Sequence, residues 1–284
     1  MQLVALAARP QQPREDAPVQ VWGRAPGGGA ASFFRSVGGY VLRFNEIADF
    51  LLSDDGALVR CHPAQNAQAA WEPIYRQQVL PLQRAQQGQP VFHGGAVCRD
   101  GQAIAMLGPS GQGKSTLTAA CAQAGWAFLT DDCLVLDESD GIHVLPDADH
   151  VRLWADSFRA LTGTEPGAVD PDCRKPRLLA GQHALRQAVD PGRLACMLLL
   201  EEAVGEAIEL VPLSPADAAM AWCANAFVVD QRDPAVLRRG LARGAMLAQA
   251  APGYRLVYPR DYARLPEVMA VVSDCLVTAT SNAA

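Results

Sequence analysis

The stretch AIAMLGPSGQGKS, residues 103–115, places five apolar residues directly before a glycine-rich loop that ends in lysine and serine. Its last eight residues fit the pattern G-x-x-x-x-G-K-S, in which backbone N–H groups cradle phosphates and the lysine reaches the outer ones. The pattern requires a strand before the loop and a helix after it. The apolar run at 103–107 and the alanine-rich run at 116–124, which Gly125 ends, predict both.

Lysine is rare in this chain, because only two of the 24 basic residues are lysines, Lys114 and Lys175. Arginine presents a planar fork and lysine a compact ammonium, so Lys114 marks a position where a point charge between two phosphates is required. We expect Ser115 to bind Mg²⁺ and the whole loop to bind a nucleotide. The expected nucleotide-binding residues are Gly108, Ser110, Gly111, Gln112, Gly113, Lys114, Ser115 and Thr116.

The composition predicts a soluble enzyme of one or two domains. Half of the residues are hydrophobic, the formal net charge is -6, and no apolar run has the length of a membrane span. The acidic balance argues against a nucleic-acid surface, and we interpret the arginines at 238, 239 and 243 as a solvated helix face. The opening octet resembles no secretory signal and the cysteines form no C-x-x-C pair, so we expect a cytoplasmic protein with reduced thiols.

Turn residues divide the chain into a smaller N-terminal region and a larger remainder. Short strand-like runs at 19–22, 40–44, 48–52 and 58–61, followed by a helix through Trp71 that leads into Pro81, predict a β-rich region over residues 1–88. Residues 89–284 are then the expected catalytic domain. Within it, Ser214-Pro215 and Asp233-Pro234 have the cap and first-turn residues that begin helices.

Two further clusters add chemistry to the loop. Asp131 and Asp132 lie between apolar strand-like runs, and adjacent strand residues alternate faces, so one carboxylate can face a metal and the other a nucleophile. His93 begins the strand that a hairpin at 99–101 connects to the loop strand, so it lies beside the phosphates in one register. Acid pairs in turns and single histidines are often structural, but the loop just upstream favours catalytic roles.

The order of these features resembles the catalytic core of bacterial HPr kinase/phosphorylase: a His-Gly strand at 93–94, the loop at 108–115 and an Asp-Asp pair at 131–132. Segments at 151–154, 174–178, 194–201 and 258–261 are similar to shorter HPr-kinase-like proteins, some of which phosphorylate the C-terminal serine of lasso peptide precursors. The resemblance implies an α/β fold with a P-loop kinase core of the phosphoenolpyruvate carboxykinase and HPr kinase type and a mixed β-sheet. The glycine- and arginine-rich C-terminal signature that engages HPr is absent from the sequence, so HPr is not the expected substrate.

The resemblance also implies roles for individual residues. Lys114 would hold the phosphates of ATP, Asp131 would accept the proton of the serine hydroxyl with His93 assisting, and Ser115 and Asp132 would hold Mg²⁺. The roles of the two aspartates can be exchanged. The cations suited to contact the nucleotide, or a carboxylate or phosphate of the substrate, are Arg152, Lys175, Arg177 and Arg260.

We therefore expect an ATP- and Mg²⁺-dependent serine kinase that acts on a peptide or small protein, with a lasso precursor as the leading substrate. Two alternatives stay open: a small-molecule kinase or carboxykinase-like enzyme, and a non-catalytic, nucleotide-gated binding module. ATP turnover separates the binding module from both enzymes, and phosphate on a peptide separates the kinase from the carboxykinase. The sequence leaves open whether the protein forms a homo-oligomer and whether it prefers ATP or GTP.

Overall fold

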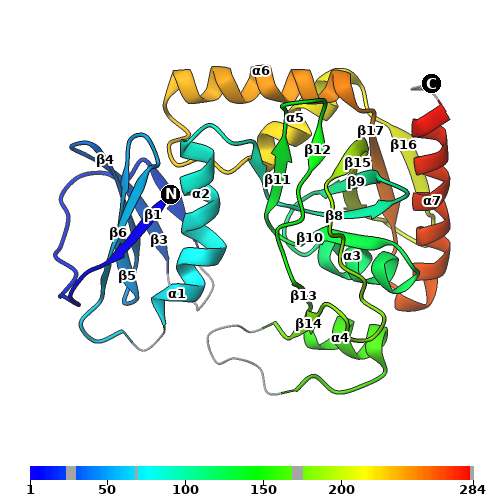
Figure 1. The fold of residues 1–284 in the computed structure, drawn as a ribbon, viewed down its shortest axis with the longest axis horizontal. Helices are drawn as coiled ribbons and strands as arrows, with labels where there is room; N and C mark the ends of the chain where they lie inside the picture. Colours follow the sequence, from blue (N-terminus) through cyan, green and yellow to red (C-terminus); the bar gives the residue numbers. More distant parts are fainter. Residues whose placement is uncertain (24–29, 68–69, 168–174, 282–284) are drawn as a thin grey trace. The chain divides into compact units, whose positions relative to one another are not determined.

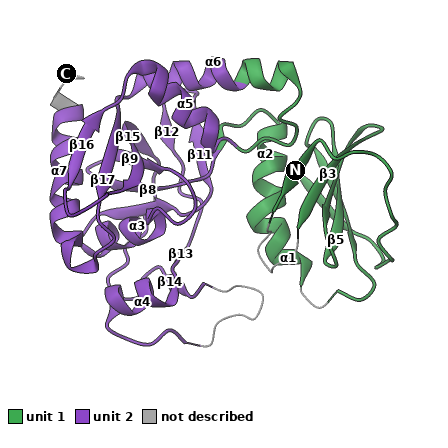
Figure 2. Ribbon diagram, turned by 180° about the vertical axis from the view of Figure 1, so that it is seen from behind, with its two compact units in different colours: residues 1–91, 170–174, 227–239 green, residues 92–169, 175–226, 240–284 purple. Residues whose placement is uncertain are grey.

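A computed structural model describes residues 1–23, 30–67, 70–167 and 175–281, and the chain falls into two compact units (Figures 1 and 2). Unit 1 contains the described residues of 1–91 and 227–239, and unit 2 contains those of 92–169, 175–226 and 240–284. The chain therefore first changes unit after residue 91. It returns to unit 1 at 227–239. A single boundary at residue 88 would assign that segment to the second domain.

Unit 1 is built on a six-stranded sheet in which five strands form an antiparallel meander and β1 joins β6 in parallel. Helical segments cover the apolar face that the period-two alternation of the strands creates. Four of the strands and the helical segment confirm the prediction, whereas the sequence does not predict β1 and β3. The elements are β1 (Gln2–Ala5), β2 (Gln20–Trp22), β3 (Ala31–Ser36), β4 (Gly39–Phe44), β5 (Ala48–Ser53), β6 (Leu58–Pro63), α1 (Trp71–Ile74), η1 (Tyr75–Val79) and α2 (Leu80–Gln86).

Unit 2 contains a mixed sheet that includes β9 (Gln102–Leu107), the strand that precedes the glycine-rich loop. The hairpin partner β8 (Gly94–Arg99) is antiparallel to β9, and β15 (Gly192–Glu202) is parallel to it on the other side. The sheet order is β10-β8-β9-β15-β12-β11-β7, and β17 and β16 follow on from β15. These further strands are β7 (Val91–Phe92), β10 (Ala127–Thr130), β11 (Leu134–Asp137), β12 (His143–Val144), β16 (Glu209–Pro212) and β17 (Gly253–Tyr258).

Helices cover both faces of this sheet. On one face α3 (Lys114–Gln123) and α7 (Leu265–Ser281) pack with Ile104 and Met106, and on the other α5 (Pro215–Asn225) packs with Ala103, Ala105 and Leu107. Because successive strand residues point to opposite faces, an apolar run without alternation serves both cores. The C-terminal part of α6 (Pro234–Ala250) contributes Leu247 to the second core. The result is a mixed α/β fold with mixed sheets, as expected.

Three smaller elements lie beside α3 in Figure 1: α4 (Ala155–Thr162) and the two-stranded ribbon of β13 (His150–Arg152) and β14 (Arg177–Leu179). The short helix η2 (Tyr262–Arg264) precedes α7. The predicted caps are confirmed, because Ser214 accepts the backbone N–H of Asp217 and Asp233 accepts that of Ala235. None of the described helices combines the length and the hydropathy that crossing a bilayer requires. The seven described cysteines are free thiols, and Cys173 lies outside the described residues.

Candidate functional site

The glycine-rich loop connects β9 to α3 in unit 2, between the elements that the motif predicts. Gly111 and Gly113 adopt φ values of +90° and +83°, which side-chain-bearing residues rarely adopt. A Cβ on Gly113 would also lie 2.5 Å from the hydroxyl of Tyr258, and that hydroxyl donates to the carbonyl of Gln112 at 2.9 Å. The helix begins at Lys114 rather than at Thr116. Ser115 therefore lies in its first turn, where N–H groups point out of the helix.

Lys114 folds back over its own loop. Its ammonium donates to the carbonyl oxygens of Gly108 at 2.6 Å and Pro109 at 3.0 Å, and only 6% of the residue is exposed. Burial lowers the pKa of Lys114, while the carboxylates of Asp132 and Asp131 act in the opposite direction. The ammonium thus lies among carbonyl dipoles and in the field of two carboxylates. A bound phosphate would take over from the carbonyl contacts, because a full negative charge attracts the ammonium more strongly.

Asp131 is buried and joins the loop helix to the ribbon strand β13. Its Oδ1 accepts a hydrogen bond from the hydroxyl of Ser115 at 2.8 Å, and its Oδ2 accepts the backbone N–H of Arg152 at 2.8 Å. Burial and then the adjacent Asp132 carboxylate raise the pKa of Asp131 to about 7. The carboxyl group is consequently fixed in orientation beside the first turn of α3.

The carboxylate of Asp132 points toward the guanidinium of Arg152 rather than toward Ser115. Its Oδ2 accepts from the guanidinium of Arg152 at 2.5 Å. Burial alone would raise the pKa of Asp132, but the charges of Arg152, His93 and Lys175 outweigh burial and lower it. The two aspartates follow β10 in a turn where Asp132 has a φ of 67°, so strand alternation does not explain their divergence. The left-handed residue turns the second carboxylate away from the first.

His93 lies between β7 and β8, one residue before the strand that it was expected to begin, and the hairpin places it next to the end of β9. Its Nδ1 is 3.2 Å from the carbonyl oxygen of Asp132. A carbonyl only accepts, so Nδ1 carries the hydrogen and Nε2 is the acceptor nitrogen of the neutral ring. Burial lowers the pKa of His93, and the charges of Lys114 and Lys175 lower it further. The neutral imidazole is therefore the favoured form near pH 7.

Asn225, at the C-terminal end of α5, positions both His93 and the start of the glycine-rich loop. The sequence alone does not identify this residue. Its backbone carbonyl accepts the N–H of His93 at 2.6 Å, and its side-chain oxygen accepts the N–H of Gly108 at 3.3 Å. Its amide nitrogen donates to the carbonyl of Ala221, which fixes the side chain. His93 and Gly108 are thus both hydrogen-bonded to one residue, Asn225, at the C-terminal end of α5.

The four candidate cations differ in position. Arg152 bridges the acid pair, with its N–H on Asp131 and its guanidinium on Asp132. Lys175 acts electrostatically on Asp132 and His93. Arg177 is exposed on β14, opposite Arg152 in the ribbon register. Arg260 forms an ion pair of 2.9 Å with Glu202, and its side chain is 53% exposed.

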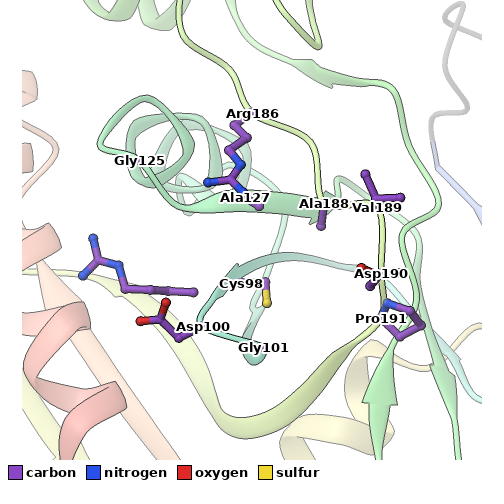
Figure 3. Close-up of a pocket in the computed structure, with 11 residues that line it drawn as sticks. Cys98, Asp100, Gly101, Gly125, Ala127, Arg186, Ala188, Val189, Asp190 and Pro191 are labelled. Carbon is purple, nitrogen blue, oxygen red and sulfur yellow. The ribbon is translucent and has the colours of Figure 1, made fainter.

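A pocket of about 320 Å³ is lined by residues other than those of this cluster (Figure 3). Asp100 and Gly101, in the turn between β8 and β9, form one side, and the segment Arg186 to Pro191 forms the other. The turn is at the start of β9, whereas the glycine-rich loop follows its end. The polar groups that converge near the loop therefore define the candidate site, and this pocket does not.

Comparisons with known proteins add a distant likeness. No protein-family model matches the chain, and no curated protein matches it either. The solved structure of the Hpr(Ser) kinase/phosphatase from Coxiella burnetii is similar over 66% of this chain and 97% of that chain, with 12% sequence identity and a TM-score of 0.34. Values this low assign no residue, so each role depends on the contacts within this chain.

Proposed function

We propose that this protein is an ATP- and Mg²⁺-dependent kinase that transfers the γ-phosphoryl group to a serine hydroxyl of a peptide or small protein. The leading candidate substrate is the C-terminal serine of a lasso peptide precursor, as the sequence resemblance implies. The observation that carries the proposal is the junction of loop and acid pair. Ser115 donates to Asp131 at 2.8 Å, and Lys114 lies in the field of both carboxylates.

The groups at this junction fit Mg²⁺ bound together with phosphates. Mg²⁺ prefers oxygen ligands and is usually held by one or two carboxylates plus substrate phosphates. The described residues contain no group of three or more His, Cys, Asp or Glu arranged to hold a metal. Ser115 and Asp131 nevertheless supply two oxygen atoms at one place. When bound, the ion would neutralise charge on the β- and γ-phosphates.

The contacts favour the exchanged roles of the two aspartates. Asp131 is hydrogen-bonded to the loop serine, the arrangement of a P-loop serine and its metal-binding aspartate, so we assign it to Mg²⁺ with Ser115. Its raised pKa would also suit a base, but that pKa results from burial and from the adjacent Asp132 carboxylate, and a bound metal ion would lower it. Asp132 lies beside His93 and Arg152, so we assign it to the acceptor side.

In the proposed reaction the serine oxygen attacks the γ-phosphorus, and the bond from phosphorus to the β–γ bridging oxygen breaks to release ADP. Asp132 accepts the hydroxyl proton, and Arg152 holds that carboxylate in place through its guanidinium. Lys114 contacts the phosphates as its carbonyl contacts are replaced. His93, hydrogen-bonded to the backbone of Asp132, fixes the turn that carries the base and presents Nε2 as an acceptor.

Mass spectrometry of peptides incubated with the protein and Mg-ATP tests this proposal. Peptides that end in Ser, in Ala or in Ser-amide form the series, and the Lys114→Ala variant provides the background. We expect a gain of about 80 Da on the Ser peptides, the mass of one added phosphoryl group. ADP formation with phosphate only on small molecules would favour the carboxykinase-like alternative. Nucleotide binding without turnover would favour the binding module.

A further inference from the structure

Trp154 is a half-exposed tryptophan that follows Arg152 by two residues. Its exposed fraction is 52%, although tryptophan side chains are largely buried on average. Two residues earlier, Arg152 contacts both aspartates. In the extended segment 151–154 the intervening Leu153 is buried, so Arg152 and Trp154 share the opposite face. The indole therefore lies on the side of the segment that faces the acid pair.

Lys175 links this indole to the acid pair. Its ammonium lies 5.2 Å from the centre of the Trp154 ring, within the range of a cation–π contact. The backbone holds the two neighbours together, because the N–H of Leu153 donates to the carbonyl of Pro176 at 3.0 Å. The charge of Lys175 also acts on Asp132, His93 and Lys114. One cation thus connects an exposed aromatic face to the groups that surround the transferred phosphoryl group in the proposed reaction.

The position of Trp154 is fixed relative to the glycine-rich loop. The helix α4 begins directly after it, and Ser157 in the first turn of α4 accepts a hydrogen bond of 3.1 Å from the hydroxyl of Thr116 in α3. The hydroxyl of Tyr262 lies 3.0 Å from the same serine and donates to Asp156 at 2.9 Å. These contacts tie the segment that carries the indole to the helix that carries Lys114 and Ser115.

We propose that Trp154 and Lys175 bind the C-terminal end of the acceptor peptide. The terminal carboxylate binds the ammonium of Lys175, and the side chain of the residue before the acceptor serine packs on the indole. A peptide end offers both a negative charge and an apolar group within one residue, which matches a lysine that lies over an exposed aromatic face. An adenine base carries no negative charge, so it would contact only the indole ring of Trp154 and not the ammonium of Lys175. This inference rests on the proposed kinase function.

Binding of labelled peptides, measured by fluorescence anisotropy, tests the inference without turnover. The peptides end in Phe-Ser or Gly-Ser, each as free acid and as amide, and are titrated with the whole protein in Mg²⁺ and a non-hydrolysable ATP analogue. We expect the acid to bind about tenfold more tightly than the amide, and Phe-Ser several-fold more tightly than Gly-Ser. Lys175→Gln should abolish the first difference and Trp154→Ala the second. Lys175→Arg and Trp154→Phe should retain part of each.

Controls come from the same unit. Arg193→Gln removes an exposed cation on β15, and Val211→Ala removes an apolar side chain that is 44% exposed on β16. Neither variant should change the preference for the acid over the amide or for Phe-Ser over Gly-Ser. Wild-type protein that phosphorylates peptides but prefers neither the acid nor Phe-Ser would overturn the inference and leave the kinase function standing. Wild-type protein that binds peptides with both preferences but transfers no phosphate would overturn only the kinase function. If Trp154→Ala raises the KM for ATP and leaves peptide binding unchanged, the ring contacts the nucleotide and the inference is wrong.

Discussion

The hydroxyl of Ser115 donates to Oδ1 of Asp131 at 2.8 Å and so joins the first turn of α3 to the turn that follows β10. The other carboxylate oxygen accepts the N–H of Arg152, so the ribbon strand β13 is held at the same point. Three separate segments, around Ser115, Asp131 and Arg152, therefore meet at one buried carboxyl group. This convergence explains why the loop and the acid pair act as one site in our proposal.

The two aspartates should respond differently to substitution. We expect Asp131→Asn to weaken the dependence of activity on Mg²⁺, raising the Mg²⁺ concentration for half-maximal rate by at least about tenfold. Asp132→Asn should lower the rate of transfer by roughly two to four orders of magnitude, the usual contribution of a general base, with ATP affinity changed only a few-fold. Single-turnover kinetics over a Mg²⁺ titration measure both effects. The opposite pattern would restore Asp131 as the base.

Asp131 should also make stability depend on pH when no metal is present. Its pKa is about 7 in the folded protein and 3.8 in an unperturbed aspartate, so between these pH values the folded state holds a proton that the unfolded state has lost. The free energy of unfolding therefore falls as pH rises from about 4 to about 7, by at most ~4 kcal/mol. In EDTA, Asp131→Asn should melt several degrees above the wild type at pH 8 and near it at pH 4.

Asp140→Asn, at an exposed position of the same unit, is the matched control for this experiment. It should shift the melting temperature little at either pH. The asparagine at position 131 can keep both contacts, because its oxygen accepts from Arg152 and its amide donates to Ser115. A variant less stable than the wild type at pH 8 would show that burial of the charge is not what raises the pKa of Asp131.

Gly113→Ala tests whether the shape of the loop matters. The backbone there has a φ of +83°, and the new Cβ would lie 2.5 Å from the hydroxyl of Tyr258. We expect a loss of about 1–2 kcal/mol in stability and a larger loss in Mg-ATP affinity. Adding Tyr258→Phe should recover part of the loss, because it removes the clash but not the strain. Gly240→Ala has open space in α6 and should stabilise by roughly 0.5–1 kcal/mol. Thermal melts and ATP titration report both quantities.

The elements nearest the loop could be predicted because their signals are local. The apolar run of β9, the hairpin turn at 99–101 and the proline-marked start of α5 each encode one structure within a few residues. Other elements gave weaker signals. The strand β3 follows a stretch rich in Pro and Gly, and Pro81 lies in the first turn of α2, so it does not end the helical segment.

The candidate site could be predicted only in part, because several of its contacts link distant segments. The sequence predicts that Lys114 and the aspartates lie near one another. It does not predict that Ser115 forms its hydrogen bond with Asp131 rather than with Asp132. Asn225 accepts hydrogen bonds from His93 and Gly108, although it lies 117 residues after Gly108 in the sequence. No motif or residue spacing in the sequence indicates these contacts. Trp154 follows Arg152 by two residues in the sequence, but only the structure shows that it is 52% exposed. Such contacts depend on how strands are ordered in the sheet, which no local pattern encodes.

Isothermal titration of Mg-ATP into the wild type and Lys114→Ala tests the central claim most directly, with Arg193→Gln as a control of similar charge change. The ammonium of Lys114 rests on two loop carbonyls, at 2.6 and 3.0 Å, and a bound phosphate should draw it away from them. We predict saturable binding to the wild type and to the control, and an affinity lower by about tenfold or more in Lys114→Ala. Equal affinity in the wild type and a folded Lys114→Ala variant would contradict the account.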